Sequence, residues 1–375
     1  MDLTFAPADA AAIPLHVIAQ GGLDEWLADQ SDMVANWVRA TGFAAQLGSV
    51  ALIPDAQGGI AMALAGYGTP EARARGRFHL AAAAAQLPEG AYALHGLDPA
   101  RAAEESLGWL LSQYSFDRYH EQKRTKARLV APAGVDAARI ETIAAGEALT
   151  RDLVNIPASD MGPAELEGAC ATLATRNGAS IEVIRGDALL DRNFPMIHTV
   201  GRASARAPRL IDMRWGTSGP RLTLVGKGVC FDTGGLNLKP GSSMALMKKD
   251  MGGAANVLGL AQMIMDLGLP LQLRVLVPAG FELVGNGTEC GYFDLRAVDK
   301  PLDHPEPDFS AEDLTCELEE AEVPEGMLVR AVRAVIPGGT RCGRRGQCRS
   351  SPEAPSSAPP RQLDVVSRPW HLLNG

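Results

Sequence analysis

Two neighbouring segments decide the fold of this chain: LVGKGVCFDTGGLNLKP at 224–240 and KKDMGGAA at 248–255. The first begins as an apolar strand and continues directly into a glycine-rich loop, and the second is a loop that leads into a helix. In open α/β sheets, ligands bind in the crevice beyond the carboxyl ends of the strands. The two segments therefore predict an α/β domain with a ligand site at that edge of its sheet.

Four of the charged side chains in these two segments are candidates for the site: Lys227, Asp232, Lys239 and Asp250. The two aspartates offer hard carboxylate oxygens close to glycines, which allow the backbone to approach a ligand, and this combination suits a divalent cation. The alternative is structural, namely tight turns with solvated charges, and either motif alone leaves it open. The two motifs together favour the cation site.

Two other kinds of glycine-rich site do not fit this sequence. A nucleotide P-loop requires a glycine five residues before Gly226 and a serine or threonine after Lys227, and the chain has neither. A dinucleotide-binding loop requires a third glycine at the position of Phe231. Nucleotide phosphates are therefore not the expected ligand.

Composition limits the protein class. The chain has 375 residues, enough for two domains, and its 46% hydrophobic and 5% aromatic content is typical of packed helices and parallel strands. A net charge of −9 argues against attraction to nucleic acid or anionic lipid. The N-terminus lacks a signal-peptide pattern, and no apolar run reaches about 18 residues. We therefore expect a cytoplasmic protein without a membrane partner.

Residues 1–125 predict a small N-terminal α/β domain, because apolar strand-like runs alternate with helical periodicity. The expected strands are 14–19, 49–53 and 92–95, and the expected helices are 70–87 and 99–114. The stretch 118–136 is charged and has few apolar positions, which indicates a solvated linker or connecting helix, with the linker placed at 126–137.

Residues 138–279 predict the core of a second, catalytic domain, in which strands and helices alternate as in a doubly wound, mostly parallel sheet. One helix is expected over 138–153. Another begins near Pro163, since proline suits the first helical turn, and ends at Gly178 as at a C-cap. The expected strands are 181–184, 210–215, 222–225 and 271–277.

The sequence changes character after Ala279. An acidic stretch over 281–325 precedes an arginine-rich stretch over 330–349 and a Ser/Pro/Ala-rich segment over 350–360 whose composition usually stays disordered. We expect residues 280–375 to be a truncated or out-of-frame tail, which leaves the catalytic domain incomplete at its C-terminal end. The nucleotide sequence would refute this hypothesis if no single-base change restored a related motif.

The strings GKGV-x-FDTGG and DMGGAA resemble the signature of the cytosolic leucine aminopeptidase family. Further matches are RDLVNIP at 151–157, GRAS at 201–204 and LRVLVPA at 273–279. The resemblance implies a small N-terminal α/β domain followed by a doubly wound catalytic domain. It also implies a cytoplasmic hydrolase, a metalloprotease with two manganese or zinc ions, that forms a homo-oligomeric hexamer and takes peptides with a free N-terminus as substrates.

The resemblance also assigns roles to the four charged residues. It implies that Lys227, Asp232 and Asp250 bind metal, with Asp232 bridging two ions, and that Lys239 is the catalytic residue that faces the substrate carbonyl. Two such ions would bind the α-amine of the peptide, polarise the scissile carbonyl and activate water. The product would be an N-terminal amino acid of the leucine type.

One part of the family signature is missing. The family supplies its remaining ligands and a catalytic arginine from the string Asn-Thr-Asp-Ala-Glu-Gly-Arg, which this sequence lacks, and the partial echo at 308–314 is a coincidence. A catalytically impaired pseudoenzyme or structural subunit is therefore the alternative function. A nucleic-acid-binding role rests only on the arginines of 330–349, for which a solvated tail is the favoured interpretation.

Overall fold

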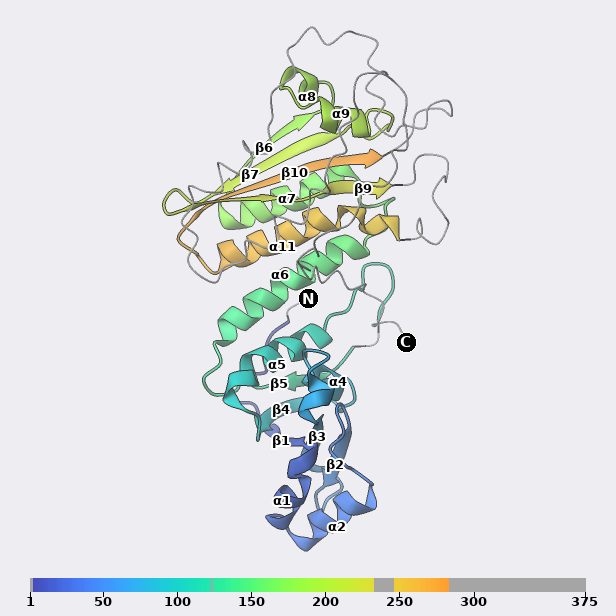
Figure 1. The fold of residues 1–375 in the computed structure, drawn as a ribbon, viewed down its shortest axis with the longest axis vertical. Coiled ribbons are helices and arrows are strands. Elements are labelled where there is room, and N and C mark those ends of the chain that lie inside the picture. Colours follow the sequence, from blue (N-terminus) through green and yellow to red (C-terminus); the bar gives the residue numbers. More distant parts are fainter. Residues whose placement is uncertain (1–2, 123, 233–245, 283–375) are drawn as a thin grey trace, which may run out of the picture. The chain divides into compact units, whose positions relative to one another are not determined.

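The computed structural model of this chain describes residues 3–122, 124–232 and 246–282 (Figure 1). Lys239 and the tail beyond residue 282 lie outside the described residues, so the expectations for them are not addressed by the structure. Two five-stranded sheets, each packed with helices, make up the described part of the chain. This confirms the α/β class. No helix of the described ranges is long and apolar enough to cross a membrane.

The first sheet has the strand order β2-β3-β1-β4-β5. Its strands are β1 (Ala12–Ala19), β2 (Val50–Pro54), β3 (Ile60–Gly68), β4 (Gly90–His95) and β5 (Ala127–Leu129). β2 is antiparallel to β3, and the other neighbouring pairs are parallel. The three predicted strands are confirmed, and β5 lies inside the segment predicted as a linker. The domain boundaries themselves stay predictions.

The helices of this part are η1 (Gln20–Gly22), α1 (Leu23–Ala28), α2 (Asp32–Ala40), α3 (Pro70–Arg73), α4 (Leu80–Ala84) and α5 (Pro99–Ser112). The prediction of a single helix over 70–87 is wrong. α3 and α4 are separated by residues 74–79, which include Phe78 with a positive φ of 60°. Gly108 of α5 leaves room for Phe78, since a Cβ at Gly108 would clash with it. Packing against α5 therefore overrides helix propensity here.

The second sheet has the order β6-β7-β10-β8, and β9 also pairs with β10. Its strands are β6 (Ser180–Arg185), β7 (Arg209–Trp215), β8 (Arg221–Val225), β9 (Gly228–Asp232) and β10 (Gln272–Glu282). β10 is parallel to β8 and β9, whereas β7 is antiparallel to β6 and β10. The four predicted strands are confirmed, and the described sheet mixes parallel and antiparallel pairs.

The helices around this sheet are α6 (Ala137–Asn155), α7 (Pro163–Asn177), α8 (Ala188–Asp191), α9 (Pro195–Gly201), η2 (Met247–Met251) and α11 (Gly252–Asp266). The two predicted helices, α6 and α7, are confirmed. Gly178 ends α7 with a left-handed φ of 66°, as the C-cap prediction required. Alternate residues of β10, namely Leu273, Val275, Val277 and Ala279, are buried in the core that the sheet shares with α7 and α11.

α11 contacts the sheet and also packs on α6 (Figure 1). The two helices approach closely at two glycines, because a Cβ on Gly259 would lie 2.5 Å from the carbonyl oxygen of Gly146. Thr150 on α6 also donates a hydrogen bond of 3.2 Å to the carbonyl oxygen of Ala255 on α11. These contacts fix the first half of α11 against the middle of α6.

Candidate metal site

A kink between β8 and β9 shapes the candidate site. Both strands pair with β10, so the chain follows the same neighbouring strand before and after the kink. The sequence predicted a loop directly after Val225, and this prediction is wrong for the residues that form β9. Gly226 donates a hydrogen bond of 3.0 Å to the carbonyl oxygen of Leu276. A Cβ at Gly226 would lie 2.7 Å from the Cα of Ala254. Glycine is therefore required where the kink meets the start of α11.

The same kink brings Lys227 to Asp250. The amide of Ala254 donates to the carbonyl oxygen of Lys227 at 2.9 Å, which ties the kink to the first turn of α11. Lys227 Nζ lies 2.8 Å from Oδ1 and 2.8 Å from Oδ2 of Asp250, which is carried by η2. The Lys227 side chain is 51% exposed and that of Asp250 is 19% exposed. Two of the four predicted site residues are thus in direct contact.

Asp232 is the last residue of β9 and is buried, with 7% of its surface exposed. β9 and η2 lie next to each other, so the strand that ends in Asp232 runs beside the helix that carries Asp250. Asp232 Oδ1 is shielded from solvent. Three of the four predicted residues therefore belong to one neighbourhood, and the fourth, Lys239, lies outside the described residues.

The chemistry of these side chains fits a divalent cation. Asp250 Oδ2 is shielded from solvent, and the Lys227 ammonium lies 2.8 Å from it. Shielded carboxylate oxygens are costly unless a positive charge is close, and hard oxygens suit hard divalent ions. Within the described ranges, no group of three or more His, Cys, Asp and Glu side chains gathers. The donors on hand are therefore one amine and two carboxylates.

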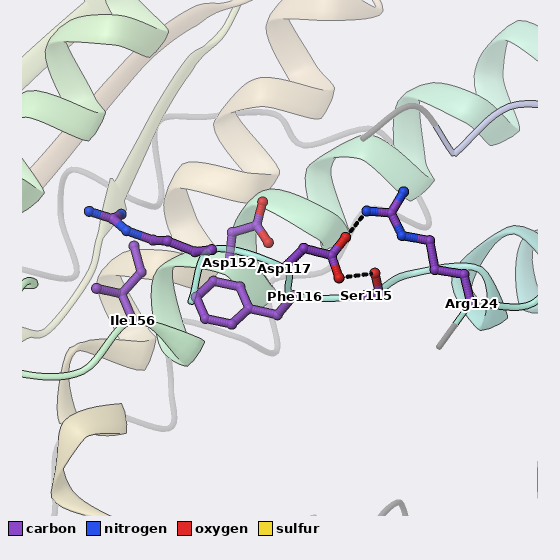
Figure 2. A pocket seen from close by; sticks show the side chains of 7 residues that line it. Ser115, Phe116, Asp117, Arg124, Asp152 and Ile156 are labelled. Atoms are coloured by element: carbon purple, nitrogen blue, oxygen red, sulfur yellow. Dashed lines mark hydrogen bonds and ion pairs between the residues drawn. The ribbon is translucent and has the colours of Figure 1, made fainter. Parts of the chain in front are cut away.

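A separate cavity of about 390 Å³ lies beside the end of α6 (Figure 2). It is lined by Ser115, Phe116, Asp117, Arg118, Arg124, Asp152 and Ile156. Asp117 pairs with Arg124 and accepts a hydrogen bond of 2.8 Å from Ser115, as Figure 2 shows. None of the predicted site residues lines it. Of the lining residues, Arg118 and Arg124 belong to the charged stretch 118–136 that was interpreted as solvated sequence, and no motif there pointed to a cavity.

Comparison with known proteins defines the class of this fold and site. The model of the M17 aminopeptidase N-terminal domain matches residues 13–132, and the model of the cytosol aminopeptidase family catalytic domain matches residues 148–288. The chain belongs to the M17 cytosol aminopeptidase family. The catalytic match extends past Ala279, where the sequence analysis placed the end of the family likeness.

Individual relatives agree with this assignment. A probable cytosol aminopeptidase of Leifsonia xyli is 34% identical over 72% of this chain and 58% of that protein. One of Aeropyrum pernix is 35% identical over 62% of this chain and 48% of that protein. The crystal structure of the cytosol aminopeptidase from Coxiella burnetii matches with a TM-score of 0.70 and 36% identity, covering 76% of this chain and 62% of that one.

A further neighbour is the bottromycin maturation enzyme BotP in complex with Mn, with a TM-score of 0.62 and 29% identity over 74% of this chain and 61% of that one. The family is one of metal-dependent enzymes. The chain spans about half the length of the curated relatives it matches.

Proposed function

We propose that this chain is a metal-dependent aminopeptidase of the leucine type that releases N-terminal amino acids from peptides by two-metal hydrolysis. The observation that carries the proposal is the contact between Lys227 and the shielded carboxylate of Asp250, beside the strand that ends in the buried Asp232. Family membership supports it, because the relatives are named aminopeptidases.

The proposed roles follow from the chemistry of each side chain. Asp250 and Asp232 would hold the metal ions through carboxylate oxygens, with Asp232 shared between two ions. Lys227 would become a ligand only after losing the proton that now binds Asp250, so metal binding would release a proton. The bound ions would hold the peptide's amine, polarise its carbonyl and activate water.

Lys239 is proposed to act on the substrate rather than on the metal. A charged lysine facing the scissile carbonyl would stabilise the negative charge that develops on its oxygen. We also propose manganese or zinc as the native ions, peptides as substrates, a cytoplasmic location and a hexameric assembly. Metal analysis of the purified chain and light scattering after size exclusion test the ions and the assembly.

Hydrolysis of leucine p-nitroanilide in added Mn²⁺ tests the activity. We expect turnover by the wild type and a loss of at least about 100-fold in Asp250→Ala, because that variant removes a metal ligand. Asp266→Ala is the matched control: Asp266 ends α11 and pairs with Arg176, away from the kink, so activity should be kept. Equal rates in wild type and Asp250→Ala would reject the proposal.

A second function has its own supporting observation. The sequence lacks the string Asn-Thr-Asp-Ala-Glu-Gly-Arg, from which the family resemblance expects further metal ligands and a catalytic arginine. This favours a catalytically impaired pseudoenzyme or structural subunit. A folded wild-type chain that binds Mn²⁺ and yet hydrolyses no leucine or other aminoacyl p-nitroanilide would support this second function.

A further inference from the structure

Lys248 makes a contact that the proposed metal chemistry does not use. It lies on η2, two residues before Asp250, and its Nζ donates a hydrogen bond of 3.0 Å to the carbonyl oxygen of Asn155. Asn155 is the last residue of α6. The bond therefore joins the segment that carries the candidate metal ligand to the end of a helix far away in the sequence.

The end of α6 is suited to receive a lysine. The last four carbonyl groups of a helix have no partner within it, and the C-terminus carries a partial negative charge. The last turn of α6 has no basic residue of its own. Lys248 supplies the positive charge from another element, so the contact is favourable for both partners.

Three residues at the end of α6 and one tyrosine hold the Asn155 carbonyl group in place. Asn155 Nδ2 donates to the hydroxyl oxygen of Tyr114 at 3.1 Å, and that hydroxyl donates to Asp152 Oδ1 at 2.7 Å. The guanidinium of Arg151 lies 5.4 Å from the centroid of the Tyr114 ring. Burial, with the hydrogen bond to Asp152, raises the pKa of Tyr114 above its ordinary value of 10, so the hydroxyl keeps its proton.

These contacts give a physical role to a segment whose function was open. RDLVNIP at 151–157 was noted in the sequence only because it resembles the family, and no chemistry was attached to it. In the structure, the side chains of Asp152 and Asn155 are both hydrogen-bonded to Tyr114. They thereby hold the end of α6, whose Asn155 carbonyl oxygen accepts the bond from Lys248. Figure 2 shows Asp152 and Ile156 of this segment beside the cavity.

η2 benefits from such a contact because its own hydrogen bonds stabilise it only weakly. It is a five-residue 3₁₀ helix, a form whose hydrogen-bond geometry is poorer than that of an α-helix, and no side chain caps its N-terminus. Met251 anchors the C-terminal end of η2 in the core, whereas among the described side chains the Asp250 carboxylate itself pairs only with Lys227. A side chain that is half exposed in its ion pair, as Lys227 is, fixes geometry poorly.

We propose that Lys248 is a positioning residue: it ties η2 to the end of α6 and thereby holds the Asp250 carboxylate in place for a divalent cation. The inference rests on the metal site of the proposed function. It adds a residue that touches neither metal nor substrate. Residues that orient metal ligands typically change metal affinity by about 10–100-fold when they are lost.

Mn²⁺ affinity of the full chain, measured from the EPR signal of free Mn²⁺, tests the proposal without relying on activity. Lys248→Met keeps the aliphatic stem and removes the ammonium, and we expect Mn²⁺ binding weakened about tenfold or more. Lys249→Met is the matched control, because the neighbouring Lys249 is exposed, and affinity should not change. Lys248→Arg, which restores a donor cation, should recover most of the affinity.

Hydrogen exchange of the metal-free chain separates this inference from the proposed function. We expect faster amide exchange across 247–256 in Lys248→Met and unchanged exchange in Lys249→Met. If wild type binds Mn²⁺ no better than Asp250→Ala, the proposed metal site is wrong, and hydrogen exchange alone decides the positioning role. Unchanged exchange in Lys248→Met, or wild-type Mn²⁺ affinity in a chain that does bind Mn²⁺, would overturn the inference.

Discussion

Glu105 carries a carboxylate into the core beside the first sheet, where only 1% of its surface is exposed. It accepts hydrogen bonds from the hydroxyl of Tyr67 at 2.7 Å and from the amide of Leu80 at 2.8 Å. Glu105→Ala would leave both donors without this acceptor, so we expect a loss of about 2–4 kcal/mol in the free energy of unfolding. Urea titration followed by circular dichroism measures it.

The neighbouring Glu104 provides the control for this prediction. Its side chain is 23% exposed and pairs with Arg77 and Arg101 at the surface. Exposed ion pairs contribute about 0–1 kcal/mol, so Glu104→Ala should be far milder than Glu105→Ala. Equal losses in the two variants would show that burial of the Glu105 carboxylate is not what matters.

Tyr67 makes stability depend on alkaline pH. Burial, and next the hydrogen bond to Glu105, raise the pKa of Tyr67 above its ordinary value of 10. The folded state therefore keeps the phenol proton where the unfolded state loses it. We expect this contribution to stability to be complete below about pH 10 and to be lost as pH rises above it.

Urea titrations between pH 8 and pH 11 measure this dependence. Burial also raises the pKa of Tyr92 and Tyr114, so Tyr67→Phe should reduce the alkaline slope without abolishing it. An identical slope in wild type and Tyr67→Phe would contradict the assignment.

At the scale of the helices, the contact between α6 and α11 depends on the absence of side chains. A Cβ on Gly259 would lie 2.5 Å from the carbonyl oxygen of Gly146 and close to Thr150 Oγ1 as well. Backbone cannot give way cheaply, so Gly259→Ala should cost about 1–3 kcal/mol of stability. Thermal unfolding of the variant measures the loss.

Gly168, inside α7, is the matched control. A Cβ there would meet nothing within 4 Å, so Gly168→Ala should be neutral or stabilising by about 0.5–1 kcal/mol through helix propensity. If both alanine variants behaved alike, helix propensity and not the close approach would govern the Gly259 position.

The sequence predicted those elements that carry their own local signal. α6, α7 and the Gly178 cap follow from periodicity, proline and glycine placement. β3 was not predicted, because its sequence, IAMALAGYG, has small residues and only one β-branched side chain. Its strand conformation comes from pairing with β1 and β2. β9 was not predicted as a strand, because it forms by pairing with β10, whose residues are far away in the chain.

The sequence also predicted only part of the candidate site, namely its charged residues. The spacing of glycines and charges indicated Lys227, Asp232 and Asp250, and the structure brings the first and last into contact. Lys248 could not be found from sequence, because its partner is a backbone carbonyl at the end of α6, an acceptor that no side-chain motif records.

At the scale of the whole molecule, metal binding should stabilise the fold, since a ligand that binds only the folded state adds RT ln(1 + [L]/Kd) to the free energy of unfolding. At 100 times Kd this is about 2.7 kcal/mol, or about 5–10 °C in Tm for a domain of ordinary size. We expect Mn²⁺ to raise the Tm of the wild type by this amount, and EDTA to reverse the shift.

Asp250→Ala distinguishes binding at the proposed site from unspecific binding of Mn²⁺ to a chain of net charge −9. The variant should show no Mn²⁺-dependent rise in Tm, because loss of the Asp250 carboxylate on η2 leaves Lys227 and Asp232 as the remaining donors. Surface carboxylates binding Mn²⁺ at random would raise the Tm of both chains equally. That outcome would show that the site formed by β9, η2 and the kink after β8 is not where Mn²⁺ binds.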